Sequence, residues 1–302
     1  MRTDKIGQPP AEERYATKLA LEPGRLIREI DEPIWVGNIL WVFTDPHRGH
    51  ELAYNRWYER DHFYGGCMVG ASNFAGSRWV ATRRHKQARL VGDADWPFPS
   101  TDGSYACVYY VWGAHFEEWL PWASTEVGRL YEANRGFQAR THYNTAIYDY
   151  EWRAYREPDP VPLELAIEHR YPGLVAQFVS ARDDDFDELD QWFDEMLPSW
   201  LEGSPVANVS SWKIHDNPAP AVRTDPGPRP PGDPSTPHIP GDTQAIRRRL
   251  QLYFLESDPL LSWDHHHDLA SRLEDSGVGR VDIALPFIAT VPGTDRYVDE
   301  LW

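Results

Sequence analysis

Three side chains near residue 60 have the types and the spacing that acid–base chemistry requires. Tyr58 and His62 lie four residues apart, which places them on one face of a helix, and Asp61 directly precedes His62. Histidine has an unperturbed pKa of about 6.5, so it exchanges protons at neutral pH. We expect His62 to act as general acid or base, with Tyr58 as a hydrogen-bond partner and Asp61 as a weaker, orienting candidate. The alternative is that the helix ends at Asp61 and His62 and that both reach solvent.

An internal repeat provides a control for these residues. The segment 54–62 (YNRWYERDH) matches the segment 189–197 (LDQWFDEML), which lies 135 residues later. In the second copy, Met196 and Leu197 belong to a continuous apolar stripe and occupy the positions of Asp61 and His62. Burying a polar group without a partner costs about 1–3 kcal/mol. Two such polar groups would destabilise a helix that has only a structural role, so we expect Asp61 and His62 to mark a functional site in the first copy.

The elements around these segments recur in the same order in both halves. Strand-like runs in the first half cover 39–44, 72–80, 105–112 and 137–148, with helical patterns at 54–62 and 116–133. The corresponding strands in the second half cover 174–180, 207–214, 250–256 and 280–288, with helical patterns at 189–197 and 259–274. This order predicts an α+β fold of two ferredoxin-like β-α-β-β-α-β repeats. Because each unit leaves one face of its sheet bare, we expect the two sheets to form an intrachain α+β barrel.

The same pattern predicts the organisation of the chain. We expect an N-terminal arm (1–34), a first repeat holding the active half (35–150), a connector (151–172), a second repeat (173–290) and a C-terminal arm (291–302). Nine prolines in 217–241 predict a long extended loop, either a solvated insertion or a lid over a pocket. Tyr297, Leu301 and Trp302 are expected to dock the C-terminal arm onto the body.

Further candidates lie on the strands of the first half. Alternation puts Arg140 and His142 in one polar row, which is either a solvent face or the wall of a pocket. Asn73 aligns with Asn208, so it is either a substrate contact or a structural hydrogen bond. The tryptophans expected to stack on a substrate, or otherwise to pack in the core, are Trp57, Trp79 and Trp112. Trp119 and Trp122, near His115, add to an aromatic surplus that predicts an aromatic-walled site in the first half.

The pattern Asn55-Arg56-Trp57-Tyr58-x-x-x-His62, behind a strand and a short loop, resembles the EthD-like branch of the dimeric α+β barrel superfamily. The likeness covers most of 35–150 and, more weakly, 173–290, where Leu197 replaces the histidine. It implies a barrel cavity in which a histidine and a few hydroxyl or amide donors move protons. Such members include isomerases, polyketide cyclases, dehydratases and oxygen-using monooxygenases. Haem-binding members also exist, but no motif identifies a proximal ligand among His115, His142 or His169.

Our leading hypothesis is therefore a cofactor-independent lyase, dehydratase or isomerase acting on a small hydrophobic, aromatic substrate, as in aromatic compound catabolism. The alternatives are a haem-dependent or cofactor-free monooxygenase and a non-catalytic protein that binds a hydrophobic ligand. No metal is expected. The tract His265-His266-His267 looks like a metal site, but successive helix residues are splayed by about 100° and cannot chelate one ion together.

Composition limits the partners. Acidic residues outnumber basic ones 47 to 30, giving a formal charge of −17, which argues against binding to nucleic acid or to an anionic membrane surface. No apolar run approaches the roughly 20 residues that span a bilayer. The two cysteines are too few for a disulfide framework, and we expect them reduced in a cytoplasmic protein. A second copy of the chain, in a homodimer, is the one protein partner that we consider.

Overall fold

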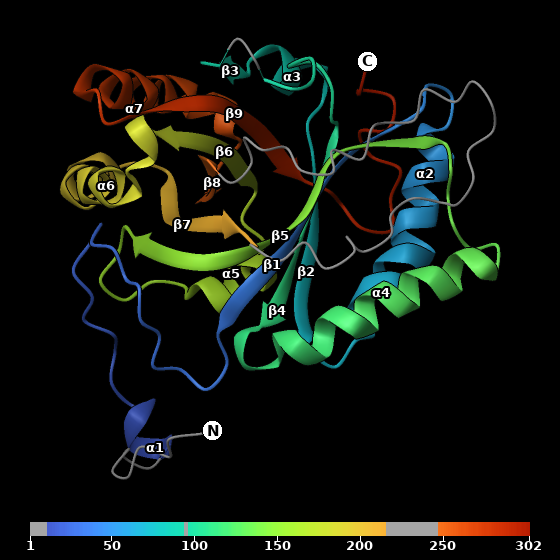
Figure 1. Ribbon diagram of the computed structural model, residues 1–302, viewed down its shortest axis with the longest axis horizontal. Coiled ribbons are helices and arrows are strands. Elements are labelled where there is room, and N and C mark those ends of the chain that lie inside the picture. The colour runs from blue at the N-terminus through green and yellow to red at the C-terminus, as the bar shows by residue number, and fades with distance from the viewer. Residues whose placement is uncertain (1–10, 94–95, 216–246) are drawn as a thin grey trace.

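The computed structural model describes residues 11–93, 96–215 and 247–302 (Figure 1). The Pro-rich segment 217–241 lies outside these residues, so its predicted role as insertion or lid is not addressed. No helix in the described part of the chain is long and apolar enough to cross a membrane.

In the described residues, eight antiparallel strands close into a barrel, four from each half. Around the barrel they follow the order β2 (Asn73–Val80), β4 (Tyr105–Trp112), β1 (Val36–Pro46), β5 (Arg140–Tyr155), β7 (Val206–Ile214), β8 (Arg248–Leu255), β6 (Gly173–Ala181) and β9 (Gly279–Ala289). Pairing of Trp79 with Ala289 and of Val80 with Ile288 closes the circle. The short β3 (Leu90–Val91) adds to the edge of β9. The predicted α+β fold, with two ferredoxin-like repeats in one intrachain barrel, is confirmed.

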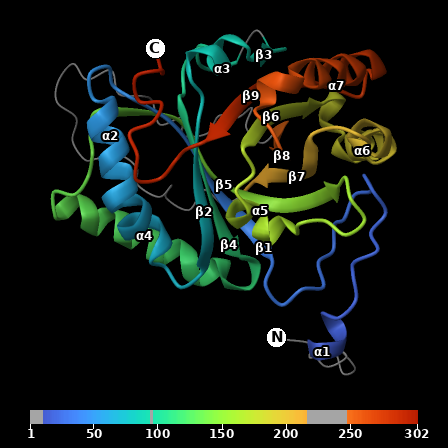
Figure 2. The same ribbon diagram turned by 180° about the vertical axis from the view of Figure 1, so that it is seen from behind.

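Helices cover the outside of each half. In Figure 1, α2 (Glu51–Trp57) and α4 (Phe116–Glu132) lie over the first-half sheet, and α6 (Phe186–Leu201) and α7 (Trp263–Ser276) lie over the second. The view from behind shows the same division (Figure 2). Three shorter helices are α1 (Ala11–Arg14), α3 (Arg83–Gln87) and α5 (Leu163–His169). Since Leu163, Ala166 and Ile167 belong to the core inside the barrel, α5 helps to fill it.

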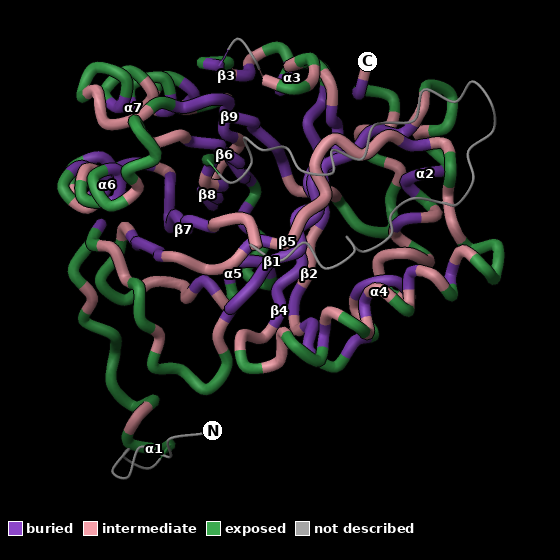
Figure 3. Tube along the Cα trace, in the orientation of Figure 1, coloured by how far each residue is buried: buried purple, intermediate pink, exposed green. Residues whose placement is uncertain are grey.

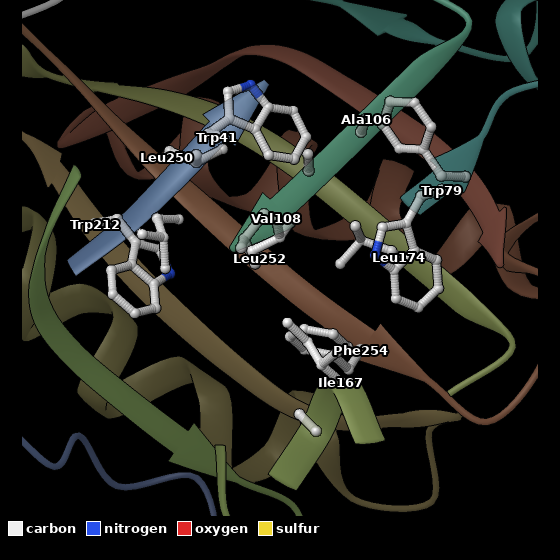
Figure 4. Close-up of a cluster of buried hydrophobic side chains, with 14 of the residues drawn as sticks. Trp41, Trp79, Ala106, Val108, Ile167, Leu174, Trp212, Leu250, Leu252 and Phe254 are labelled. Atoms are coloured by element: carbon white, nitrogen blue, oxygen red, sulfur yellow. The ribbon is translucent and has the colours of Figure 1, made fainter. Parts of the chain in front are cut away.

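Side chains pack the interior of the barrel. Most strands are buried along nearly their whole length, whereas β5 is largely of intermediate exposure (Figure 3), and residues such as Trp41, Trp212 and Phe254 point into the core of the barrel (Figure 4). Trp79 is one of these inward residues: it is 1% exposed and its ring meets that of Phe254 edge-on at 6.0 Å. These residues fill the interior of the barrel, and Trp79 takes the core-packing role that was one of its two predicted roles.

Strand β5 is longer than predicted. Its first part pairs with β1 and its last part, Tyr148–Tyr155, pairs with β7, so this one strand joins the two halves. Part of the predicted connector 151–172 therefore belongs to β5 and to α5. The segment looked like a connector because it is charged. Its charge is compensated by a buried ion pair, in which the Arg153 guanidinium lies 2.7 Å from the Glu164 carboxylate.

The helix that carries His62 does not end there. After α2 the chain continues as a π-helix, η1 (Tyr58–Met68), in which i→i+5 bonding widens each turn. Residues four and five apart then lie on one face, which aligns Tyr58, His62, Gly66 and Cys67. The alternative in which His62 ends the helix in solvent is therefore wrong.

The C-terminal arm docks on the first half, as predicted. Leu301 is fully buried, the Trp302 ring lies 4.1 Å from the Lys86 ammonium, and Asn55 Nδ2 donates to the carbonyl of Thr294 at 3.0 Å. The arm thus covers the outer side of α2.

Candidate functional site

A largely enclosed cavity of about 30 Å³ lies between the outer face of the first-half sheet and the helices η1 and α4. Its apolar walls come from β1 and α4: Leu40, Val42, Trp119, Trp122, Ala123 and Val127. Its other walls come from η1, β2 and β5: Tyr58, His62, Gly66, Cys67, Asn73, Arg140 and Thr145. About 10–15 Å³ of such space holds one water molecule, whereas sites for drug-sized ligands measure about 300 Å³ or more. The closed cavity therefore fits an ion or a functional group of a few atoms, and not a whole aromatic molecule.

His62 is held in place by ring packing. Its ring stacks on Trp57 at 4.6 Å with an interplanar angle of 15°, and meets Tyr58 edge-on at 5.2 Å. A Cβ at Gly66 would lie 2.8 Å from His62 Nδ1, so the imidazole rests directly on this glycine. Burial, followed by the positive charges of Arg140 and Arg78, lowers the pKa of His62 to about 3. The ring is therefore neutral at physiological pH.

Neither ring nitrogen of His62 has a hydrogen-bond partner within the described ranges. A neutral imidazole has one N–H donor and one acceptor nitrogen. Both are available to a ligand in the cavity, which makes His62 able to take a proton from that ligand and to return it.

Arg140 is 6% exposed, and no Asp or Glu among the described residues forms an ion pair with it. Its guanidinium donates to the carbonyl of Phe137, the hydroxyl of Tyr131 and, at 2.7 Å, His142 Nε2. It also lies 5.0 Å from the centre of the Trp57 ring. These partners are all neutral, so the cavity wall carries an uncompensated positive charge.

His142 connects Arg140 to a hydroxyl in the cavity. Because arginine can only donate, His142 Nε2 must accept, which leaves the proton of the neutral imidazole on Nδ1. Nδ1 lies 2.7 Å from Thr145 Oγ1, so it donates to that oxygen. The Thr145 hydroxyl proton has no acceptor among the described residues and can point to a ligand.

Tyr58 and Asn73 complete the polar part of the wall. The Tyr58 hydroxyl shares a 3.0 Å hydrogen bond with the Tyr109 hydroxyl, and burial raises its pKa well above the usual value of 10. Asn73 donates from Nδ2 to the carbonyl of Cys67, while its Oδ1 is buried without a partner. Asn73 thus makes the structural hydrogen bond that was one of its two predicted roles, and it also lines the cavity.

The remaining candidates lie away from the cavity. Both carboxylate oxygens of Asp61 accept from Arg135, at 2.8 and 3.0 Å, so Asp61 does not orient His62. Trp57 supports the far face of the His62 ring and donates to the carbonyl of Arg135 at 2.7 Å. Trp112 is bonded to the carbonyl of Pro33 at 3.1 Å and, like His115, does not line the cavity. Trp119 and Trp122 supply the aromatic wall that the first half was expected to have.

Sequence reasoning missed Thr145 and Cys67. Thr145 follows His142 by three residues, across a register shift of β5 against β1, so simple alternation does not place it. Cys67 joins Tyr58 and His62 because η1 is a π-helix. The pair Gly65-Gly66, unusual in the middle of a helix, is the available signal of a special turn.

In the described part of the second half, apolar side chains occupy the positions equivalent to this polar site. Phe193, Leu197 and Leu201 stand where the first copy has Tyr58, His62 and Gly66, and all three are buried in an apolar core. In the histidine tract, His266 is fully buried and His265 stacks on Trp200 at 4.0 Å. No group of three or more His, Cys, Asp or Glu among the described residues is placed to hold a metal ion.

The residues around the cavity do not fit a haem. The space is far smaller than a porphyrin, and His62 is stacked flat between other groups instead of projecting as an axial ligand. The other candidate ligands are engaged elsewhere: His115 with Glu118 at 3.0 Å, His142 with Arg140, and His169 against the Tyr171 ring at 4.5 Å.

Comparisons with known proteins find distant likenesses of fold. No family model matches the chain, and no curated protein matches it. The structure is similar to a putative chlorite dismutase (TM-score 0.47, 11% identity, 89% of this chain and 100% of that chain). It is also similar to a putative monooxygenase from Fusobacterium nucleatum (TM-score 0.45, 10% identity, 86% of this chain and 94% of that chain). A third similar structure is a heme-binding protein from Thermus thermophilus (TM-score 0.43, 9% identity, 88% of this chain and 96% of that chain).

Proteins this distant share a fold, and activity does not follow from it. None of these three is named a lyase or isomerase, so that expectation finds no support in these likenesses. The EthD-like branch in particular stays a prediction. In the described residues, the chain forms one α+β barrel from two ferredoxin-like repeats in a single polypeptide.

Proposed function

We propose that the first half of the chain is the site of a cofactor-free monooxygenase, with His62 as the base. The observation that supports this most is the pairing of a neutral His62, with both nitrogens unbonded, and a cationic Arg140 across one small, enclosed cavity. The first step is removal of a proton from an acidic O–H or C–H of the substrate by His62. Its lowered pKa makes His62 a weak base in the empty cavity, and a substrate anion beside Arg140 offsets the positive charge that contributes to this lowering. The resulting anion lies beside Arg140.

The enclosure favours reaction with dioxygen. A substrate anion in water is reprotonated rapidly, whereas a cavity walled by tryptophan and aliphatic side chains excludes bulk water. Dioxygen is small and apolar, so a cavity with such apolar walls can accommodate it. The overall reaction is AH₂ + O₂ → A=O + H₂O, in which two hydrogens of the substrate are replaced by one oxygen atom and the second oxygen leaves as water.

Dehydratase chemistry fits this site less well. A dehydratase needs a group that is protonated beforehand to protonate the departing hydroxyl. His62 is neutral, and burial raises the pKa of Tyr58 well above 10 and that of Cys67 to about 12, so both are poor acids. Isomerisation would start with the same proton transfer to His62, and the need for oxygen separates the two reactions.

The substrate must enter through an opening that the closed state lacks. The loop after α4 covers this side, since Arg135 binds Asp61 through its side chain and Trp57 through its carbonyl. We expect the loop to move when a substrate binds, because a cavity of about 30 Å³ admits only its reacting end.

The test is oxygen uptake with a panel of small phenols, enols and anthrone-like compounds, under air and under argon. We expect consumption of one O₂ per product under air, no turnover under argon, and a loss of about 100-fold or more in His62→Asn. Turnover that continues under argon would exclude the monooxygenase and favour an isomerase.

Two alternatives have their own readouts in this experiment. A Soret absorption band in the purified protein would identify the haem-dependent alternative. Binding of the panel without turnover, unchanged in His62→Asn, would identify a ligand-binding protein.

A further inference from the structure

We infer that the cavity beside His62 is a binding site for an oxyanion, and that Arg140 and Thr145 are the residues that recognise it. The substrate class is then a compound whose reacting group is a compact, singly charged oxygen anion: an enolate, a phenolate or a carboxylate. This inference deepens the proposed function, on which the identity of the reacting group rests. The anion site itself can be tested without turnover.

The charge of the cavity is the first argument. Arg140 is the single formal charge among the described residues that line it, because the lining contains no Asp or Glu and His62 is neutral. Three other buried arginines have carboxylate partners: Arg153 has Glu164 at 2.7 Å, Arg248 has Asp282 at 2.9 Å, and Arg78 has Glu59 at 3.3 Å. Arg89, which is also buried, donates to three backbone carbonyls instead. A buried guanidinium without a carboxylate is costly unless an anion or other acceptors compensate it. Arg140 lacks a carboxylate partner and, unlike Arg89, lines the cavity, where an anionic ligand can reach it.

The second argument is the number of donors left over. Arg140 has five N–H groups, and its three hydrogen bonds to Phe137, Tyr131 and His142 leave two of them without an acceptor among the described residues. The relay through His142 leaves the Thr145 hydroxyl proton free as well. Two guanidinium N–H groups and one hydroxyl are donors that an oxygen anion accepts from.

The third argument is size. The space of about 30 Å³ is larger than the minimum for one water molecule and far smaller than a site for a whole aromatic ligand. It matches a group of two to four heavy atoms. An ionised oxygen with its carbon, or a carboxylate, has these dimensions, whereas a phosphate ester with its substituent does not.

Formate is the probe, because it has three heavy atoms and a full negative charge at pH 7.5. Formamide is the matched uncharged probe of nearly the same shape. Binding is measured by titration calorimetry and by the fluorescence of Trp119 and Trp122 in the cavity wall. We expect formate to bind and formamide not to bind.

The variants separate the residues that recognise the anion from those that do not. Arg140→Met should weaken formate binding about tenfold or more, and Thr145→Val, which preserves the volume of the side chain, should weaken it several-fold. Arg129→Met is the control. Arg129 lies on α4, which forms another wall of the cavity, but its side chain is exposed and pairs with Glu126 at 3.5 Å. It should bind formate as the unaltered chain does.

Each outcome decides the question. If formate does not bind the unaltered chain, or if formamide binds equally well, the anion site is refuted. It is also refuted if Thr145→Val and Arg140→Met both bind formate normally, and Thr145→Val keeps the test informative should Arg140→Met fail to fold. Formate binding without oxygen-dependent turnover of the panel refutes the proposed reaction alone, and turnover without formate binding refutes the anion site alone, so the two failures give different results.

Discussion

Gly66 is the position at which the geometry of the site can be tested most directly. An alanine Cβ there would lie 2.8 Å from His62 Nδ1 and 2.9 Å from His62 Cε1, and 3.1 Å from Leu130 Cδ1. Ordinary contacts begin at 3.4 Å, so the imidazole would have to move by about 0.6 Å. It cannot do so without changing its contact with Trp57, on which it stacks at 4.6 Å.

The expected effect on stability is the sum of two opposing terms. Replacing a helical glycine by alanine stabilises a protein by about 0.5–1 kcal/mol, whereas overpacking a closed site costs about 1–3 kcal/mol. We therefore expect Gly66→Ala to lower the free energy of unfolding by about 0.5–2 kcal/mol. Gly128→Ala is the control, because Gly128 lies in α4 and a Cβ there would meet nothing within 4 Å. It should stabilise the protein by about 0.5–1 kcal/mol.

Urea unfolding followed by tryptophan fluorescence measures both free energies, and NMR titration of the imidazole measures the pKa of His62. Displacing the ring admits water, so its pKa should rise from about 3 in Gly66→Ala and stay unchanged in Gly128→Ala. If the two variants are equally stabilised and His62 titrates alike in both, the packing of His62 on Gly66 is wrong, and the orientation of the base inferred from it is wrong too.

Two further predictions concern buried ionisable groups outside the site. His266 is fully buried, both of its ring nitrogens lack a partner among the described residues, and burial lowers its pKa to about 3. The unfolded chain therefore binds a proton at this histidine at a higher pH than the folded chain, and stability falls as the pH drops from about 6.5 towards 3. His266→Leu should therefore raise the free energy of unfolding by about 1–3 kcal/mol at pH 8 and by about 2 kcal/mol more at pH 5. If urea unfolding gives the same increase at both pH values, the lowered pKa of His266 is contradicted. Arg153→Met removes one partner of a buried ion pair and should lower the free energy of unfolding by about 3–5 kcal/mol, whereas Arg272→Gln breaks the exposed pair with Asp268 and should change it by less than about 0.5 kcal/mol. Similar losses in the two variants would show that the Arg153–Glu164 pair is not buried in solution.

The sequence predicts an element correctly where the hydrophobic pattern of the segment matches the burial of its residues in the fold. Strand β4 was predicted as residues 105–112 and occupies Tyr105–Trp112, because it is buried on both faces and its aromatic and β-branched residues leave no other interpretation. The end of β5 was missed because Glu151 and Arg153 read as a solvated connector. Glu151 is compensated by Arg249 at 2.6 Å, and Arg153 by Glu164. Ion pairs between residues far apart in sequence cannot be read from a local pattern.

The candidate site was predicted in part, for the same reason. His62 and Tyr58 were chosen from a helix face that is apolar in the second copy, Asn73 from its alignment with Asn208, and Arg140 from a polar row that could line a pocket. All four line one cavity. Trp79 was assigned to a substrate and lies in the barrel core, since the local sequence of β2 does not show which face of the strand points into the closed barrel. Thr145 and Cys67 depend on a strand irregularity and on a π-helix, and neither follows from regular periodicity.

The comparison of the two halves indicates why the cavity exists where it does. Leu197 and Leu201 fill the helix–sheet space in the second half, and the first half has His62 and Gly66 at these positions. An empty space of about 30 Å³ costs about 0.7 kcal/mol, and the unpartnered Asn73 Oδ1 costs about 1–3 kcal/mol more. The second half fills this space with ordinary apolar residues, although Asn208 and His266 there also have buried polar atoms without a hydrogen-bond partner among the described residues. What distinguishes the first half is that a cavity, an arginine without a carboxylate partner and an unbonded histidine meet at one place, and a ligand that compensates them explains this better than imperfect packing.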